Sequence, residues 1–451
     1  MTTIGIASLG CAKNLVDSEI ILGILKKHNA IIVNEPGQAE VLIVNTCGFI
    51  KEAQQESIET ILKAVALKTS GNVKKIIVAG CLTQLFGSEL RNQITQVDGW
   101  VGINDFPKIA EILDEVLSGK KVFKIDSAPY IYDNSVPREI LTPHHYAYIK
   151  IAEGCDHLCS FCIIPAIKGK LRSRNINSII AEAQYLISTG VKELILISQD
   201  STQYGKDLGM SNALAVLLKK LCRISGDFWI RVLYTYPSSW TDELIDVFYE
   251  EDKICKYIDI PVQHINDDIL KSMRRGESKA TITSLISKIR KRISNTFLRT
   301  SVIVGYPGEN ENQFEELCDF LMETKFERLG AFTFSSEKGS LAEMMKNQIP
   351  DDIKNQRYDK IMRLQQQISL SNNSKLLGKQ LKCIVDSKLE EESISNYIGR
   401  TYGDSPDVDG VIYLHGENLM EGDFVIAEIT GFKEYDLVGK VTVRQGNENK
   451  S

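Results

Sequence analysis

The sequence predicts an α/β protein with three parts: an N-terminal open parallel sheet covered by helices, a central partial barrel of six β-α units, and a small C-terminal barrel of five strands. Two long stretches alternate short apolar runs with helical patterns, and this alternation is typical of parallel sheets. A third stretch has short strand patterns punctuated by Gly, Asn and Asp, which indicates a small β-barrel. We place the three domains at residues 1–125, 141–375 and 379–447.

Length and composition are those of a multidomain globular protein. The chain has 451 residues, of which 25% are charged and 43% are hydrophobic, and this length predicts roughly three domains. No apolar run approaches the ~18 residues of a membrane span, and the first residues read as a strand without the basic start of a signal peptide. We therefore expect a cytoplasmic protein with no membrane partner. The net charge of −6 argues weakly against bulk binding to nucleic acid.

The N-terminal domain places three cysteines at equivalent positions. Its expected strands are 4–8, 41–44, 75–78 and 100–103, and its expected helices begin near residue 14 and cover 51–67, 84–93 and 108–117. Cys11, Cys47 and Cys81 follow the carboxyl ends of the first three strands. Because these ends lie along one edge of a parallel sheet, we expect the three thiols to meet and to hold an iron–sulfur cluster. Unrelated loop cysteines are the alternative.

A linker separates this domain from the central one. The periodicity fades over residues 120–144, where Pro129, Pro137 and Pro143 lie among polar residues. From Tyr146 the β-α alternation restarts and repeats about six times, which indicates an incomplete barrel. Its expected strands are 146–152, 193–198, 229–234, 257–260, 299–304 and 328–334, with helical patterns such as 178–188, 214–222 and 284–293 between them.

Three further cysteines form a short loop after the first of these strands. Cys155, Cys159 and Cys162 have the spacing C-x3-C-x2-C. Cysteines this close rarely bridge each other well, but they can point at one soft metal centre. A 4Fe–4S cluster has four irons, so three thiolates leave one iron free to bind a small molecule. Zinc, with His157 as a fourth ligand, and three inert cysteines are the alternatives. The other four cysteines read as small core residues: Cys222, Cys255, Cys318 and Cys383.

Polar residues follow the later strands of the barrel, where such enzymes keep their chemistry. We expect them to line one mouth with the cysteine loop: Gln199 and Asp200 after the second strand, Gln263 and His264 after the fourth, and residues 305–309 after the fifth. Arg231 lies within the third strand. We predict that Gln199, Arg231 and Gln263 contact the cofactor, although each could instead be a cap or turn residue.

The C-terminal domain is small and acidic. A polar helix from residue 351 to about 377 leads to strands expected at 381–386, 394–400, 408–414, 423–429 and 436–443. Five such strands suggest a barrel of oligonucleotide-binding size. Residues 379–447 hold seven Lys and Arg against thirteen Asp and Glu, a balance of −6. Such a barrel should repel phosphate and attract a basic partner.

The cysteine spacing, with Phe161 just before the last cysteine, resembles the signature of radical S-adenosylmethionine (SAM) enzymes. With two three-cysteine sites and a terminal barrel, essentially the whole chain resembles the methylthiotransferases of that superfamily. The following stretches are similar to the branch called RimO: Gly10-Cys-Ala-Lys-Asn-Leu-Val-Asp-Ser-Glu19, Asn45-Thr-Cys-Gly-Phe-Ile50, Tyr148-Ile-Lys-Ile-Ala-Glu-Gly-Cys155, Tyr257-Ile-Asp-Ile-Pro-Val-Gln-His264 and Val304-Gly-Tyr-Pro-Gly-Glu309. The glycine-rich SAM motif of the superfamily is matched only loosely by residues 301–309.

The resemblance implies a radical SAM core, a TRAM-like terminal barrel, two 4Fe–4S clusters and two molecules of SAM. One SAM would bind the open iron at Cys155, Cys159 and Cys162, with Phe161 near its adenine. An electron, from a donor such as flavodoxin or ferredoxin, would cleave it to a 5′-deoxyadenosyl radical. The other SAM would methylate sulfur held on the cluster at Cys11, Cys47 and Cys81. The implied substrate is an aspartate β-carbon of ribosomal protein S twelve.

Two other functions are open to this sequence. A transfer RNA adenosine methylthiotransferase would use the same chemistry, but the Gly48-Phe49 pair and the acidic barrel count against it. A non-catalytic iron–sulfur electron carrier has little use for an open barrel or for a cluster that lacks its fourth ligand.

Overall fold

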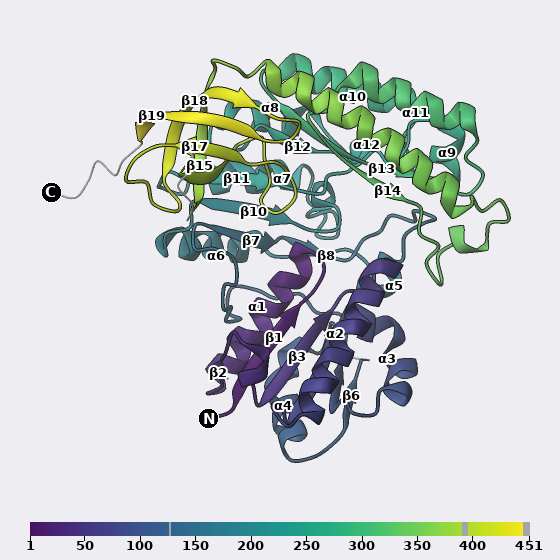
Figure 1. Ribbon diagram of the computed structural model, residues 1–451, viewed down its shortest axis with the longest axis vertical. Helices are drawn as coiled ribbons and strands as arrows, with labels where there is room; N and C mark the ends of the chain where they lie inside the picture. Colours follow the sequence, from purple (N-terminus) through teal and green to yellow (C-terminus); the bar gives the residue numbers. More distant parts are fainter. Residues whose placement is uncertain (126–127, 390–395, 445–451) are drawn as a thin grey trace.

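Three domains follow one another along the chain in the computed structural model, which describes residues 1–125, 128–389 and 396–444 (Figure 1). The N-terminal domain, coloured purple, lies against one side of the central core. The C-terminal barrel, coloured yellow, packs on the core without intervening between the other two domains. The predicted three-part α/β architecture is confirmed.

The N-terminal domain is a parallel sheet with strand order β2-β1-β3-β4-β5-β6. Its elements are β1 Thr3–Ser8, α1 Ala12–Lys27, β2 Ile31–Ile32, β3 Val41–Thr46, α2 Lys51–Thr69, β4 Lys75–Gly80, α3 Cys81–Gln93, β5 Gly99–Val101, α4 Ile109–Leu117 and β6 Val122–Lys124. Helices α1 and α4 pack on one face and α2 and α3 on the other, so β3 is buried along its whole length and reads as an almost continuous apolar run. The helices after β1 and β3 therefore leave toward opposite faces, which opens a crevice at their carboxyl ends.

Two strands of this sheet were not predicted. Strand β2 has only two residues, too few for a periodic signal. Strand β6 lies inside residues 120–144, where we predicted a linker, and pairs with β5 in parallel. The linker proper therefore begins after β6.

The central core has six main strands, as predicted. Its elements are β7 Tyr146–Lys150, β8 Ala152–Glu153, α5 Ile164–Lys168, β9 Arg172–Ser173, α6 Ile176–Ser188, β10 Glu193–Ile197, α7 Ala213–Cys222, β11 Trp229–Val232, α8 Asp242–Glu250, β12 Tyr257–Asp259, α9 Asp267–Ser272, α10 Lys279–Arg292, β13 Phe297–Val304, α11 Glu311–Thr324, β14 Arg328–Thr333 and α12 Asp351–Ser374. Strands β7, β10 and β11 form one parallel sheet and β12, β13 and β14 another, joined by a single bridge between Ile230 and Ile254. Among the described strands β7 and β14 do not pair, so the barrel is open.

The C-terminal domain is a closed barrel in the order β15-β16-β17-β19-β18. The strands are β15 Gln380–Lys388, β16 Tyr397–Thr401, β17 Ile412–His415, β18 Phe424–Phe432 and β19 Leu437–Arg444. All five predicted strands are present, although the start of the one expected at 394–400 and the end of the domain at 447 lie outside the described residues. The four cysteines predicted as core residues are buried.

Buried ion pairs join the barrel to the core. Asp404 of the barrel accepts hydrogen bonds from Arg328, with 2.9 Å between its Oδ1 and Nε. Asp409 lies 3.5 Å from Arg299. Glu193 of the core binds Arg400 of the barrel at 2.6 Å. Part of the barrel's acidity is therefore neutralised by the core and does not reach solvent.

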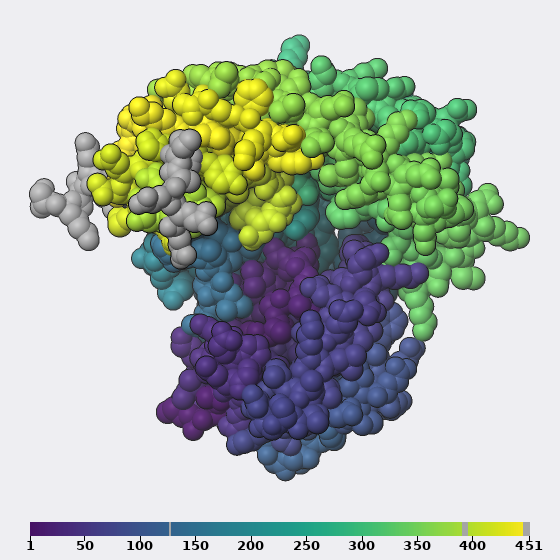
Figure 2. Space-filling model, viewed as in Figure 1, coloured from purple at the N-terminus to yellow at the C-terminus, as the bar shows by residue number. Residues whose placement is uncertain are grey.

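Polar contacts also join the N-terminal domain to the core. Arg138 of the linker forms buried ion pairs with Glu19 of α1 and Glu182 of α6. Glu337, after β14, accepts hydrogen bonds from the Lys51 amide at 3.0 Å and from Gln54 Nε2 at 2.9 Å, and so caps α2 from the other domain. Figure 2 shows the purple domain in contact with the rest of the molecule along this junction. Within the described part of the chain, no helix combines the length and the apolar character needed to cross a bilayer.

Candidate active site

The loop of Cys155, Cys159 and Cys162 lies just beyond the carboxyl end of β7. Its backbone is fixed at both ends, because the Cys155 amide donates to the carbonyl of Gly169 at 3.1 Å and the Cys162 amide donates to that of Cys159 at 3.1 Å. Gly154 has φ +80°, and a Cβ there would come within 2.7 Å of the Gly169 carbonyl oxygen. Only glycine lets the chain turn into this loop.

The middle of the loop is anchored by Ser160. Its amide donates to the carbonyl of Met273 at 3.0 Å, and its hydroxyl lies 2.7 Å from that of Tyr306. Phe161 packs against the apolar cluster that contains these two residues. The backbone that carries the three thiols is therefore fixed. The predicted contact of Phe161 with the adenine of SAM stays a prediction.

His157 and Asp200 lie together beside the cysteines. His157 Nε2 is 2.7 Å from Asp200 Oδ2, and the imidazole stacks on the ring of Tyr236 with 3.8 Å between centroids and 11° between planes. Asp200 was predicted at this mouth from its place after the second core strand. These contacts connect the cysteine loop to the residues that follow β10 and β11.

Burial shapes the acidity of the three thiols. It raises the pKa of Cys155 to about 11 and that of Cys162 to about 12, and it also raises the pKa of Cys159 above its ordinary value. In the absence of a metal the thiols are therefore protonated at neutral pH. Loading of a cluster must release those protons, as is usual for metal binding by cysteine.

Gln199 and Gln263, two of the predicted cofactor contacts, lie after β10 and β12. Gln199 Nε2 donates to Glu153 at 2.6 Å, but its Oε1 is buried and has no hydrogen-bond partner among the described residues. Gln263 has φ +67°, a conformation that is uncommon for a non-glycine residue. The buried free oxygen of Gln199 suits a bound donor group, and both cofactor contacts stay predictions.

Arg231, the third predicted contact, has a different environment. It is completely buried, with Nε 2.7 Å from Glu193 and Nη1 2.8 Å from the carbonyl oxygen of Tyr402 in the C-terminal barrel. These bonds tie Arg231 to the interface between core and barrel. Its contact with SAM also stays a prediction.

The N-terminal cysteines converge at the edge of their sheet. Cys11 precedes α1, Cys47 follows β3 and Cys81 is the first residue of α3. A Cβ on Gly10, which has φ +83°, would lie 2.8 Å from Cys47 Sγ, and a Cβ on Gly48 would lie 3.1 Å from the carbonyl carbon of Cys81. The three loops therefore touch, and the two glycines make room for the approach.

Burial raises the pKa of Cys81 to about 12, and it also raises that of Cys47. The cation of Lys168 opposes this rise at Cys81. Lys168 belongs to α5 of the core, directly after the Cys155 loop. Lys168, six residues after Cys162, is therefore close enough to Cys81 for its positive charge to lower the pKa of that thiol.

A buried network of two lysines and two carboxylates connects the sites. Lys150 Nζ donates to Glu153 Oε2 at 2.7 Å and also to Asp17, and Lys168 Nζ donates to Asp17 Oδ2 at 3.2 Å. Asp17 belongs to α1 and the other three residues to the core. We did not predict this network, although Lys150 inside the apolar run 146–152 is a signal that could have indicated it, since a buried charge needs a partner.

A second contact crosses the same boundary. Lys13, two residues after Cys11, places its ammonium 3.5 Å from the ring centroid of Tyr234. Tyr234 follows β11 and has φ +60°. Through this segment the Cys11 loop reaches the mouth of the core, two residues from the Tyr236 ring that stacks on His157.

Comparison with protein families divides the chain in the same way. Residues 3–102 match the uncharacterized protein family UPF0004, residues 149–321 match the Radical SAM superfamily, and residues 377–442 match the TRAM domain.

Comparison with curated proteins finds relatives over almost the full length. The ribosomal protein uS12 methylthiotransferase RimO of Clostridioides difficile is 44% identical over 442 residues, which are 98% of this chain and 99% of that protein. The protein of the same name from Pelotomaculum thermopropionicum is 46% identical over 441 residues, again 98% and 99%.

Solved structures with a similar fold are radical SAM enzymes. The methyltransferase TsrM of Kitasatospora setae, bound to tryptophan and a SAM analogue, has a TM-score of 0.55 at 12% identity, over 87% of this chain and 80% of that chain. The cobalamin-dependent radical enzyme OxsB has a TM-score of 0.52 at 12% identity, over 81% and 56%. At these identities the likeness concerns the fold alone.

Proposed function

The chain belongs to the RimO family of ribosomal protein uS12 methylthiotransferases, and we propose that it transfers a methylthio group to the β-carbon of an aspartate in uS12, the protein also called S twelve. The observation that carries this proposal is the 44–46% identity to RimO proteins over nearly the whole of both chains. The alternative of a transfer RNA substrate loses support, because these full-length relatives are named for uS12.

We assign a 4Fe–4S cluster to each cysteine triad. Each triad offers three thiols from converging backbone, and the other four cysteines are buried in packing positions. Three thiolates suit a four-iron cluster with one open corner. When bound, the cluster at Cys155 supplies the electron that cleaves SAM, and the cluster at Cys11 supplies the site where sulfur is held and methylated by a second SAM.

The protein's own part is to hold the two sites against each other. Two contacts hold the domains together close to the cysteine sites: Asp17 of α1 pairs with Lys168 of α5, and Lys13, two residues after Cys11, packs on Tyr234 after β11. Such positioning favours a reaction in which one side chain must meet both groups with bulk water excluded. The free Oε1 of Gln199 supports its assignment to SAM binding.

We propose that the acidic barrel contributes to docking of uS12, because ribosomal proteins are strongly basic. Asp404 and Asp409 of the barrel bind core arginines, but Glu417 and Glu428 are exposed and form no ion pair within the described residues. We also propose that the protein acts in the cytoplasm, in keeping with a ribosomal substrate. The proposed reaction needs an electron donor of the flavodoxin or ferredoxin class.

The deciding experiment compares uS12 and transfer RNA from a strain that lacks this gene with the same molecules from the complemented strain. Mass spectrometry should find the methylthio group on the uS12 aspartate only after complementation, and no change in transfer RNA. Loss of a methylthio group from adenosine with uS12 unchanged would contradict the proposal.

A further inference from the structure

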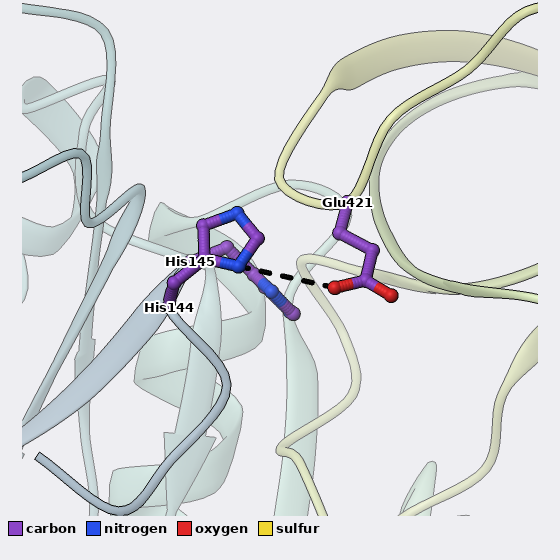
Figure 3. A group of neighbouring side chains, drawn as sticks. All are labelled: His144, His145 and Glu421. Carbon is purple, nitrogen blue, oxygen red and sulfur yellow. Dashed lines mark ion pairs between the residues drawn. The ribbon is translucent and has the colours of Figure 1, made fainter.

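A group of two histidines and a glutamate lies between the core and the C-terminal barrel, away from both cysteine sites. His144 and His145 precede β7, and Glu421 belongs to the loop between β17 and β18 (Figure 3). One nitrogen of each imidazole and one oxygen of the carboxylate all lie within 4.8 Å of one another. His144 Nδ1 and Glu421 Oε2 are 3.8 Å apart. Two imidazoles and a carboxylate are a ligand set that divalent transition metals favour.

His145 has the features of an oriented ligand. Its side chain is completely buried, and its Nε2 lies 2.8 Å from Asp386 Oδ1. Because a carboxylate only accepts, Nε2 carries a proton, and in the neutral imidazole Nδ1 then carries the lone pair. That Nδ1 is buried and has no hydrogen-bond partner among the described residues. A histidine whose second nitrogen donates to a carboxylate is the usual arrangement behind a bound metal.

The backbone brings Glu421 to this histidine. Gly422 has φ +85°, and a Cβ there would lie 2.9 Å from His145 Cβ. The Gly422 amide donates to the carbonyl of Val385 at 2.8 Å, which fixes the loop to β15. The loop is therefore held against the histidines by backbone packing, independently of any attraction between the side chains.

We propose that His144, His145 and Glu421 bind a divalent metal ion of the Zn²⁺ class, which clamps the C-terminal barrel to the core. The ion would accept the lone pair of His145 Nδ1. Without the ion this nitrogen is a buried acceptor that has no partner among the described residues, which destabilises the folded state. The site lies before the amino end of β7, whereas the Cys155 loop lies beyond its carboxyl end. Its role is therefore stabilisation of the domain interface.

The test uses the full chain with both clusters reconstituted, so that the cysteines are occupied, after passage over a chelating resin. Calorimetric titration with Zn²⁺ should find one site in the wild type. His144→Ala and Glu421→Gln should each weaken it at least tenfold, and both side chains are exposed, so the variants should fold. Zn²⁺ should also raise the melting temperature of the wild type more than that of either variant.

A matched control is His28→Ala. His28 is an exposed histidine 3.1 Å from a carboxylate of Asp114, but that pair has no second imidazole. This variant should bind Zn²⁺ like the wild type. Equal affinity in the wild type, His144→Ala and Glu421→Gln would overturn the proposal, and so would an equal loss in His28→Ala.

A separate observation concerns Lys13 and rests on the proposed function. Its ammonium lies between the two cysteine sites, over Tyr234, and no carboxylate of the described residues pairs with it. The neighbouring Lys150 and Lys168 are by contrast fully engaged with Asp17 and Glu153. Of the three lysines Lys13, Lys150 and Lys168, Lys13 is therefore the one without a carboxylate partner among the described residues, and its ammonium can receive an acidic side chain.

We infer that Lys13 binds the carboxylate of the target aspartate and so places its β-carbon between the two sites. A charge-assisted hydrogen bond of this kind contributes about 1.5–3 kcal/mol. Lys13→Gln should therefore raise the KM for uS12 about ten- to hundredfold, while 5′-deoxyadenosine formation without substrate and the iron content stay unchanged. Lys13→Arg should restore part of the affinity.

Lys63→Gln, an exposed lysine on α2 of the same domain, serves as the control and should leave the KM unchanged. If the wild type and Lys13→Gln both methylthiolate uS12 with the same KM, Lys13 does not bind the target carboxylate and this inference is wrong. If the wild type itself leaves uS12 unmodified, the proposed function fails first.

Discussion

Asp17 lies six residues after Cys11 and pairs with Lys168, six residues after Cys162, with 3.2 Å between Oδ2 and Nζ. The pair is buried and spans the boundary between two domains. We predict that Asp17→Asn destabilises the full chain by about 3–5 kcal/mol, because it leaves buried ammonium groups short of a partner. Urea denaturation measures this. The variant should also form less methylthiolated uS12 per 5′-deoxyadenosine released, and an unchanged ratio would contradict the positioning role.

Cys159→Ala should abolish both SAM cleavage and product. The variant removes one of the three thiols to which we assign the cluster of the core, and that cluster is the proposed source of the electron. Chromatographic assay of 5′-deoxyadenosine checks the outcome. Cys222→Ala removes a buried cysteine of α7 that faces neither site and should retain activity.

Cys47→Ala should separate the two halves of the reaction. The variant leaves the Cys155 loop intact, so SAM cleavage should continue, while methylthiolated uS12 should disappear. Wild-type protein reconstituted under anaerobic conditions should contain about eight iron atoms per chain, and this variant about four. If Cys47→Ala still makes the methylthiolated product, the N-terminal triad does not hold the sulfur.

Docking of uS12 should depend on the exposed acids of the barrel. The double variant with Glu417→Lys and Glu428→Lys should bind uS12 more weakly than the wild type. A higher salt concentration should reduce this difference in affinity, since salt screens surface charges. Glu323→Lys on α11, also exposed, serves as the control outside the barrel and is compared with each single barrel variant, which changes the net charge by the same amount. If neither a higher salt concentration nor removal of residues 379–451 changes the affinity for uS12, the barrel does not contribute to uS12 binding.

Asp98 should make the N-terminal domain sensitive to acid. Its burial alone would raise its pKa, but hydrogen bonds from Lys68 and the Ile76 amide outweigh this and hold the pKa below the ordinary value. A lowered carboxyl pKa contributes stability above the unfolded-state value of about 4, and this contribution is lost as the pH falls further. Asp98→Asn should cost about 2 kcal/mol at pH 7. The difference from wild type in urea denaturation should shrink below pH 4, and a constant difference would contradict this assignment.

Periodicity and strand-end position made much of this molecule predictable. Cys11, Cys47 and Cys81 could be placed together because a parallel sheet brings its carboxyl ends to one edge, whatever the separation in sequence. The barrel strands were predictable from alternation and turn residues. Strand β6 was not, because it has only three residues and lies among the polar residues of the predicted linker.

Contacts between domains had no comparable signal. Arg231 was predicted as a cofactor contact because it is a charge within a strand, and no local pattern indicated its bonds to Glu193 and to the barrel. Asp17 and Lys168 are ordinary helix residues in the sequence, and only the docking of two domains pairs them. Such partners depend on the relative placement of whole domains, which local patterns do not encode.

The unpaired edges of β7 and β14 limit what kind of substrate the core can serve. The interior of a closed (βα)8 barrel is filled by side chains, whereas the described core strands form two parallel sheets whose outer strands, β7 and β14, do not pair with each other. Such an open edge allows a side chain on the surface of a folded protein to reach the site while the backbone of that protein stays outside the core. We therefore expect that a protein substrate of the proposed class can be modified without unfolding.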